Sequence, residues 1–323
     1  MTQNRIDVSS QDTIVNTQDA ELDPTKRRVL LSAAASMLFP IISMGCAGRA
    51  EEVLNHPGIV DLEARAGGRL GVCILNTENN QLIGNRLDER FGMCSTFKTL
   101  LTALILREIE RGTLTADQFV PYTEEDMVFY APVTTKNLVA GGMAVEALAQ
   151  ATQTTSDNVA ANLLLDLIEG PAGFTKALRA SGDGFTRLDR YETEMNLVPI
   201  GEVRDTTTPR AMTASLRHFL LGDGLTTRSQ EKLIGWMKET RTGMRRLRAG
   251  LPSDWAAGDK TGTGMAPIMV NKYNDVAIAW PPNQAPVIIT CYYDAPAAFD
   301  TIRPEDEAVL AEVGRLAGEW VTA

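Results

Sequence analysis

Two parts of the chain, one near each end, carry short apolar runs separated by polar turn segments. The runs at residues 69–75 and 81–86 flank a Thr-Glu-Asn-Asn turn, and the runs at 276–280 and 287–293 flank a Pro-Pro-Asn-Gln turn. Apolar runs of this length, bounded by turn-forming residues, are typical of β-hairpins. We therefore expect one hairpin from each end of the chain.

The segment between the hairpins, roughly residues 99–255, is helical in pattern with polar loops. Residues 57–66 predict a short helix that two glycines end, and residues 305–321 predict an amphipathic helix. Strands from both ends and helices from the middle predict an α+β fold. We expect an antiparallel sheet flanked by the terminal helices, plus an inserted all-helical lobe.

The first 50 residues have the layout of an export signal. A polar stretch is followed by Lys-Arg-Arg at 26–28 and then by an apolar run that ends near Cys46. The paired arginines behind a polar extension resemble a twin-arginine signal. The alternative is a buried core helix, although Pro40 interrupts the run. We expect residues 1–50 to be cleaved and the mature protein to be periplasmic or secreted.

The catalytic domain is then expected to span residues 51–323. Its α/β lobe would come from residues 51–93 and 256–323, and its helical lobe from about 94–255. The chain carries 31 basic and 41 acidic residues, a net charge of −10 that lies beyond residue 50, and no Lys/Arg run stands out in that part. Nucleic acids and anionic membrane surfaces are therefore unexpected partners. Two scattered histidines and no Cys-x-x-Cys predict no metal or cofactor, and we expect a monomer without a membrane span.

Ser95 and Lys98 lie one helical turn apart at the start of a strongly apolar segment. In a helix, side chains three residues apart have Cβ atoms about 5–6 Å apart, so hydroxyl and amine can hydrogen-bond. The helix N-terminus favours negative charge on an alkoxide or oxyanion, and burial would lower the pKa of Lys98 and let it accept a proton. The pair predicts serine acylation, with an N-cap serine and a solvated lysine as the alternative.

Two further motifs strengthen this hypothesis, Ser-Asp-Asn at 156–158 and Lys-Thr-Gly-Thr at 260–263. With Ser-x-x-Lys at 95–98, they resemble the signature of class A β-lactamases and penicillin-binding proteins. The resemblance covers roughly residues 55–322. It implies hydrolysis of a small-molecule β-lactam through a serine acyl-enzyme.

By this resemblance, Ser95 is the nucleophile and Lys98 a candidate base. Ser156 donates a proton to the departing ring nitrogen, and Lys260 polarises that hydroxyl and attracts the substrate carboxylate. The backbone N–H groups of Ser95 and Thr263 would form an oxyanion hole. The residues implied to contact the substrate are Tyr130, Asn158, Asn196, Thr261, Thr263 and Arg246.

Residues 190–209 resemble the omega loop of class A β-lactamases. The resemblance makes Glu192 the base that activates water for deacylation and Asn196 a residue that positions this water. It also implies an ion pair between Arg190 and Asp205 that pins the loop. The alternative for Glu192 is a solvated loop carboxylate.

Thr263 and Arg246 resemble the carbapenem-hydrolysing subgroup, where an arginine assists the carboxylate site. That subgroup also carries a disulfide from the residue before the nucleophile. Here Cys94 is present but the partner position is Gly264, so no such bridge can form. The segment 265–273 predicts a lengthened loop beside the pocket for the substrate side chain, either a ligand wall or a loop packed on its neighbours.

The sequence is thus identified as a periplasmic class A β-lactamase. A DD-peptidase or penicillin-binding protein is one competing hypothesis, against which the Glu192 loop counts. A non-hydrolytic β-lactam sensor is another.

Overall fold

The computed structural model describes residues 52–53 and 55–323, and the predicted export signal lies outside them. The strands are β1 (Glu52–Val53), β2 (Arg69–Asn76), β3 (Leu82–Asn85), β4 (Phe91–Gly92), β5 (Phe119–Pro121), β6 (Gly142–Ala144), β7 (Thr206–Thr207), β8 (Ala256–Ala266), β9 (Met269–Trp280) and β10 (Val287–Asp294). The helices are α1 (Pro57–Ala66), α2 (Phe97–Glu110), α3 (Thr134–Asn137), α4 (Val145–Thr155), α5 (Asn158–Asp166), α6 (Gly170–Ala180), α7 (Pro209–Leu221), α8 (Thr227–Glu239), α9 (Leu247–Gly250) and α10 (Pro304–Thr322).

One large sheet has the strand order β1-β3-β2-β10-β9-β8. All neighbours pair antiparallel except the short β1, which runs parallel to β3. Both predicted hairpins are present, as β2–β3 and β9–β10. Strand β8, which carries the Lys-Thr-Gly motif, is an edge strand, so one side of its backbone is open to a ligand.

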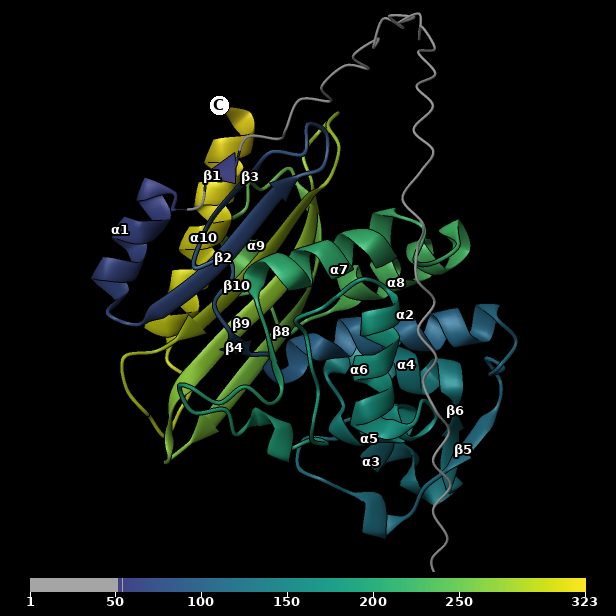
Figure 1. Ribbon diagram of the computed structural model, residues 1–323. Helices are drawn as coiled ribbons and strands as arrows, with labels where there is room; N and C mark the ends of the chain where they lie inside the picture. The colour runs from purple at the N-terminus through teal and green to yellow at the C-terminus, as the bar shows by residue number, and fades with distance from the viewer. Residues whose placement is uncertain (1–51, 54) are drawn as a thin grey trace, which may run out of the picture. The chain divides into compact units, whose positions relative to one another are not determined.

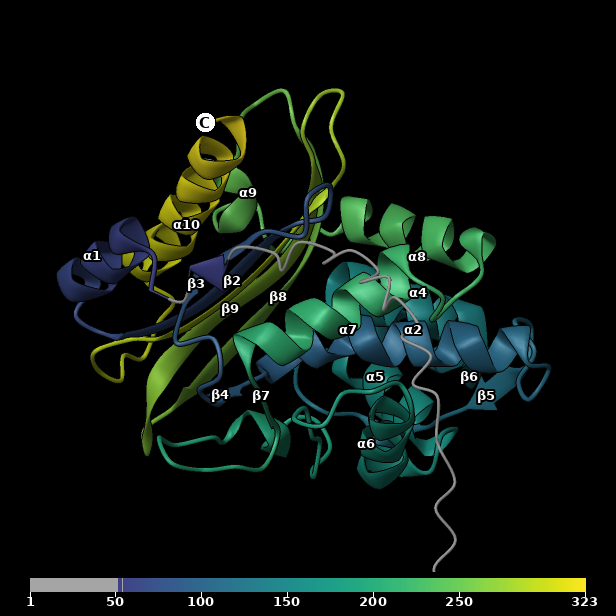
Figure 2. The same cartoon turned by 45° about the horizontal axis from the view of Figure 1, so that its top comes forward.

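Helices cover both faces of this sheet (Figures 1 and 2). Helices α1 and α10 pack on one face, and α7 and α8 contact the strands from the other. The residues of β10 alternate accordingly, since Ile289 and Tyr293 belong to the core beneath α10, while Ile288 and Tyr292 belong to the core shared with the helical segment. This confirms the predicted α+β architecture of a sheet flanked by terminal helices with a helical insertion.

Helix α2 lies within the inserted segment, and every residue from Phe97 to Leu106 is buried. This burial explains why its sequence is apolar on all sides. The insertion also contains the short β5–β6 pair, whose three-residue strands are too short to show a period of two.

The prediction of a long loop at residues 265–273 is wrong. Strand β8 continues to Ala266 and β9 begins at Met269, so only Pro267 and Ile268 form the turn. The residues that make the chain longer here than is usual in the family it resembles belong mostly to β8 and β9 and not to a loop. Lys272 is buried, with its Nζ 2.6 Å from the buried carboxylate of Asp294.

Candidate active site

Ser95 lies in a 3₁₀ turn, Cys94–Thr96, that leads directly into α2. Its hydroxyl accepts a hydrogen bond from Lys98 Nζ at 3.1 Å and donates one to Glu192 Oε1 at 3.2 Å. An amine from the same helical turn and a carboxylate from a distant loop therefore meet at one serine oxygen. Both groups are of the type that can take a proton from an attacking hydroxyl.

Lys98 is completely buried, so it is not a solvated lysine. Its Nζ lies 2.9 Å from Glu192 Oε1 and donates to Ser156 O at 2.9 Å and to Asn158 Oδ1. Burial lowers the pKa of Lys98, and the nearby Glu192 charge opposes this shift. The amine is thus easier to deprotonate than an exposed lysine.

Ser156 and Lys260 bring the second and third motifs to the same place. Ser156 ends α4 with a φ of 61°, in the left-handed region, and its Oγ accepts from Lys260 Nζ at 3.0 Å. Lys98 Nζ lies 3.4 Å from the same hydroxyl. Burial, together with the charge of Lys98, lowers the pKa of Lys260 to about 7. A chain of exchangeable protons thus connects Ser95, Lys98, Ser156 and Lys260.

Glu192 is buried, with 4% of its surface exposed, so it is not a solvated loop carboxylate. Asn196 Nδ2 donates to Glu192 Oε2 at 2.5 Å and fixes the carboxylate that faces Ser95. Asn162 brackets the peptide of Glu192, because its Nδ2 donates to Glu192 O and its Oδ1 accepts from Glu192 N, each at 2.9 Å.

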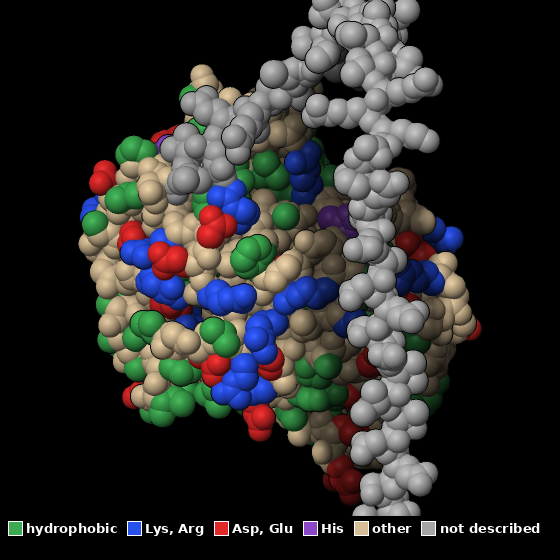
Figure 3. Space-filling model, viewed as in Figure 1, with side chains coloured by type: hydrophobic (Ala, Val, Ile, Leu, Met, Phe, Trp, Pro, Cys, Tyr) green, Lys and Arg blue, Asp and Glu red, His purple; other side chains and the backbone are tan. Residues whose placement is uncertain are grey.

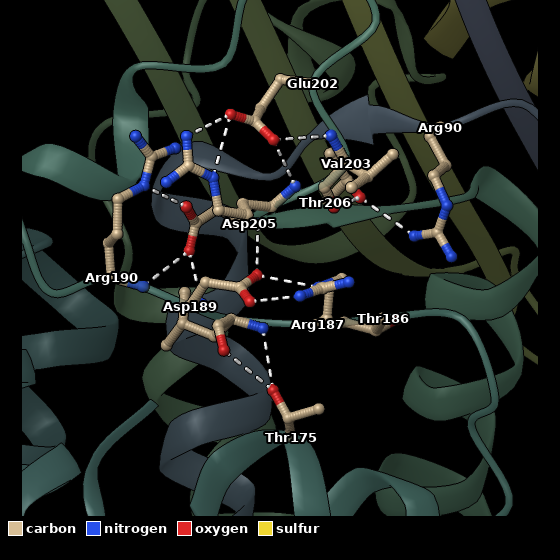
Figure 4. Close-up of polar contacts among 12 residues, drawn as sticks. Arg90, Thr175, Thr186, Arg187, Asp189, Arg190, Glu202, Val203, Asp205 and Thr206 are labelled. Carbon is tan, nitrogen blue, oxygen red and sulfur yellow. Dashed lines mark hydrogen bonds and ion pairs between the residues drawn. The ribbon is translucent and has the colours of Figure 1, made fainter. Parts of the chain in front are cut away.

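The ends of the loop that carries Glu192 are joined by a polar network (Figure 4). Arg190 Nε lies 2.6 Å from Asp205 Oδ2, which is the predicted ion pair. Asp205 Oδ1 accepts from the backbone of Asp189 and Arg190, and Asp189 Oδ2 accepts from Asp205 N. Burial raises the pKa of Asp205, and these hydrogen bonds oppose the shift. We call this network the loop neck.

The edge strand β8 closes the other side of the site. Arg246 is buried and donates from Nη1 to Gly262 O and Asn274 O, both at 2.8 Å, and from Nη2 to Thr263 Oγ1 at 2.7 Å. A Cβ on Gly262 would lie 2.8 Å from Met93 O and 3.1 Å from Ser95 N, so glycine is what lets the strand approach the nucleophile turn.

The remaining candidates are the buried Thr261 and Asn158 and the exposed Tyr130. Thr261 exchanges a hydrogen bond with Thr242 at 2.7 Å between their hydroxyls. Tyr130 is 48% exposed, and its carbonyl accepts from Asn158 N at 3.1 Å. The side-chain amide of Asn158 has a partner at each end. Its Oδ1 accepts from Lys98 Nζ, and its Nδ2 donates to Phe129 O at 2.7 Å. The Nδ2 group has a second hydrogen for a ligand.

The structure brings all of the predicted catalytic residues into hydrogen-bond contact, and it gives roles to two residues, Asp157 and Asn162, to which the sequence assigned none. Asp157 caps α5 and accepts from the backbone of Val133 and Thr134 and from the Thr134 hydroxyl, which orders the segment next to Tyr130. Its position before α5 is a helix-capping signal. Asn162 lies one turn after Asn158, so their spacing on one helix face could have revealed it.

On the face in Figure 3, basic side chains gather near the middle with acidic ones beside them. Within residues 52–53 and 55–323, no helix is long and apolar enough to cross a membrane. The same residues contain no group of three or more His, Cys, Asp or Glu side chains arranged to hold a metal ion.

A serine hydroxyl between a buried amine and a carboxylate, with a second serine–lysine pair beside it, defines a serine acyl-transfer site. The sequence model of the "Beta-lactamase enzyme family" matches residues 57–321. Beta-lactamase FAR-1 of Nocardia farcinica is 46% identical over 79% of this chain and 79% of its own. Beta-lactamase AST-1 of Nocardia asteroides is 39% identical over 90% of this chain and 94% of its own.

Solved structures agree. An ancestral class A β-lactamase superposes with a TM-score of 0.77 and 49% identity, over 81% of this chain and 98% of that one. A β-lactamase from Burkholderia vietnamiensis superposes with a TM-score of 0.77 and 42% identity, over 82% of this chain and 95% of that one. The chain belongs to the class A β-lactamases. It is a serine enzyme that hydrolyses β-lactams, as the sequence predicted.

Proposed function

We propose that Ser95 attacks the β-lactam carbonyl and that Glu192 directs water onto the resulting ester. The single observation that carries this assignment is that Ser95 Oγ lies within hydrogen-bond distance of both Lys98 Nζ and Glu192 Oε1. Either group can accept the serine proton as the carbon–oxygen bond forms. The backbone N–H groups of Ser95 and Thr263 stabilise the oxyanion, a contribution of about 10²–10³ in rate for each donor.

Deacylation needs a water molecule between Glu192 and the ester carbonyl. The Oδ1 atom of Asn196 supports such a site, because it is buried without a hydrogen-bond partner among the described residues. Buried polar atoms of this kind usually bind water. With Asn196 Nδ2 holding Glu192, the free Oδ1 would accept a hydrogen from the same water that Glu192 deprotonates.

Ser156 would protonate the departing ring nitrogen, with Lys260 supplying the proton through their 3.0 Å contact. The Lys260 ammonium and the Thr261 and Thr263 hydroxyls would bind the substrate carboxylate. Asn158 would hydrogen-bond the acylamide group, and Tyr130 would contact the substrate at the rim.

The test of these roles is Glu192→Gln, with Glu194→Gln as the matched control, because Glu194 is an exposed carboxylate two residues further along the loop. Intact-mass spectrometry during turnover of a penicillin should find Glu192→Gln trapped as the acyl-enzyme. Its deacylation should be slower by about 10²–10⁴-fold, the usual worth of a general base. Rapid clearance of the adduct would reject the role of Glu192, and a similar trap in Glu194→Gln would show a general loop defect.

We further propose that Thr263 and Arg246 favour carbapenem substrates. Arg246 orients the Thr263 hydroxyl at 2.7 Å and leaves it available to a carboxylate. Arg246→Ala should raise KM for penicillins and carbapenems, with the larger effect on carbapenems. Unchanged kinetics across a penicillin, a cephalosporin and a carbapenem would reject the assignment.

The proposal includes export of residues 51–323 as a monomer after removal of residues 1–50. It is supported by the order of polar, basic and apolar segments in the sequence. The mass of the protein recovered from the periplasm of an expression host would locate the cleavage. Retention of an Arg27→Lys, Arg28→Lys variant in the cytoplasm would support the twin-arginine route.

A further inference from the structure

The side chain of Asn274 connects β9 to the segment directly before the nucleophile. Asn274 is buried, and its Nδ2 donates to Gly92 O at 2.8 Å and to Met93 O at 3.0 Å. Gly92 and Met93 are separated from Asn274 by some 180 residues of sequence. One amide group thus uses both of its hydrogens on two successive carbonyls of one loop.

This loop needs such support because its backbone is unusual. Cys94, the residue before Ser95, has a φ of 45°, a region that residues with a side chain rarely adopt. Met93 is held on both sides, since its N–H donates to Asp205 O at 3.0 Å and its carbonyl also accepts from the Thr96 hydroxyl at 2.8 Å. The orientation of the Ser95 N–H follows from the peptides held in this way.

Asn274 also contacts the strand on the other side of the site. Asn274 pairs with Gly262 of β8 in the sheet. The backbone carbonyls of Asn274 and Gly262 both accept a hydrogen bond from Arg246 Nη1. Thr263, whose N–H is the second proposed oxyanion donor, follows Gly262 in the chain. The position of Asn274 therefore determines how the Ser95 turn and β8 lie relative to each other.

We propose that Asn274 is a positioning residue for the oxyanion hole, which sets the separation of the Ser95 and Thr263 N–H groups. The proposal rests on the function proposed above. An apolar side chain of the same size leaves the Gly92 and Met93 carbonyls without these donors and the strained turn free to shift. Such a shift weakens binding of the transition state more than binding of the substrate.

The experiment compares Asn274→Leu and Asn274→Ala with Asn85→Leu. Asn85 is a matched control because it is also a buried strand asparagine whose Nδ2 donates to a carbonyl, that of Leu70 at 2.8 Å, away from the site. Three quantities are measured: the acylation rate constant with a penicillin, the affinity for a phenylboronic acid, and the affinity for intact penicillin in a Ser95→Ala background. A boronic acid forms a tetrahedral adduct with the serine and reports on the oxyanion hole.

Both Asn274 variants should lose about 10- to 100-fold in acylation rate and in boronic acid affinity. This loss is smaller than the roughly 10²–10³-fold expected when an oxyanion-hole donor is removed altogether, because the N–H groups are displaced and not lost. Penicillin affinity in the Ser95→Ala background should change less than about threefold, because it does not depend on the oxyanion. Asn85→Leu should lower the unfolding temperature and leave the kinetics of the folded enzyme unchanged. The alanine variant leaves room for solvent and keeps the test valid should the leucine variant not fold.

Two results would overturn the proposal. Kinetics and boronic acid affinity at the wild-type level in both Asn274 variants would mean that the side chain only stabilises the fold. Equal losses in acylation and in penicillin affinity would mean that it acts on substrate binding. Absence of any Ser95 adduct in the wild-type enzyme would instead overturn the proposed function itself, and this inference with it.

Discussion

The turn that carries Ser95 and the loop that carries Glu192 meet at one hydroxyl group, but different forces hold them. The Ser95 turn leads into α2, whose first ten residues are buried in the main apolar core. The Glu192 loop has little regular structure, exposes Ile200 and Val203, and is joined at its base by the polar loop neck. Apolar burial therefore supports helix α2 behind Ser95, whereas the Glu192 loop, apart from its buried Met195 and Val198, is held mainly by ion pairs and hydrogen bonds.

The largest effect on this comparison should come from Asp205→Asn. The asparagine side chain keeps one oxygen to accept from the backbone N–H groups. Its NH₂ group replaces the carboxylate oxygen that faces Arg190, so two hydrogen-bond donors then face each other. Removing one partner of a buried pair costs about 3–5 kcal/mol, and the lower end applies here because Arg190 is 17% exposed. Urea unfolding of the variant should therefore show a loss of about 3 kcal/mol in the free energy of unfolding.

The matched control for this variant is Asp88→Asn, which breaks the Asp88–Arg210 contact. Asp88 is 64% exposed, so solvent screens its charge and the loss should stay below about 1 kcal/mol. Equal losses in the two variants would contradict the role given to the loop neck.

A smaller and opposite effect is expected from Gly264→Cys. A Cβ at position 264 would lie 2.9 Å from Cys94 Sγ, close to the roughly 3 Å that an S–S bond of about 2.05 Å imposes on these two atoms. The bridge should add about 2 kcal/mol to the free energy of unfolding. Joining the two thiols removes two electrons and two protons, so a thiol oxidant must be added. Burial raises the pKa of Cys94 to about 12 and therefore slows this oxidation. Thiol titration and unfolding of the oxidised and reduced forms provide the measurement, and an unchanged number of titratable thiols after oxidation would contradict the prediction.

The smallest effect is a pH dependence from Lys260. Its pKa of about 7 means that the ammonium loses its proton as the pH rises through neutrality. The attraction for the substrate carboxylate is then lost, so kcat/KM should fall above pH 7 and approach a tenfold loss per pH unit. Lys260→Arg should move this decline to higher pH because a guanidinium stays charged. A flat wild-type profile to pH 9 would contradict the assignment.

The sequence was sufficient for the hairpins, the terminal helices and the catalytic motifs because each is a local pattern. The motif residues Ser95, Ser156 and Lys260 could be found from short spacings, and the family resemblance supplied their partner Glu192. Lys98 and Glu192 are both buried, which rules out the alternative that they are solvated surface side chains.

Other features depend on contacts that no local pattern contains. Asn274 appears in the sequence as one polar residue among several, and only the structure shows that it reaches Gly92 and Met93. The strand at 269–273 was missed for a related reason, because extra length in the sequence does not say whether the added residues form a loop or extend two paired strands. Residues 1–50 lie outside the described part of the chain.

The loop neck supports deacylation, whereas acylation depends mainly on the turn and helix α2 that carry Ser95. Rapid-quench intact-mass spectrometry with a penicillin would measure both rate constants in the wild-type enzyme, Asp205→Asn and Asp88→Asn. For Asp205→Asn we predict that deacylation slows by about tenfold or more and acylation changes less than threefold, so that the acyl-enzyme accumulates. Equal slowing of both steps, with no accumulation of the adduct, would contradict this role of the loop neck.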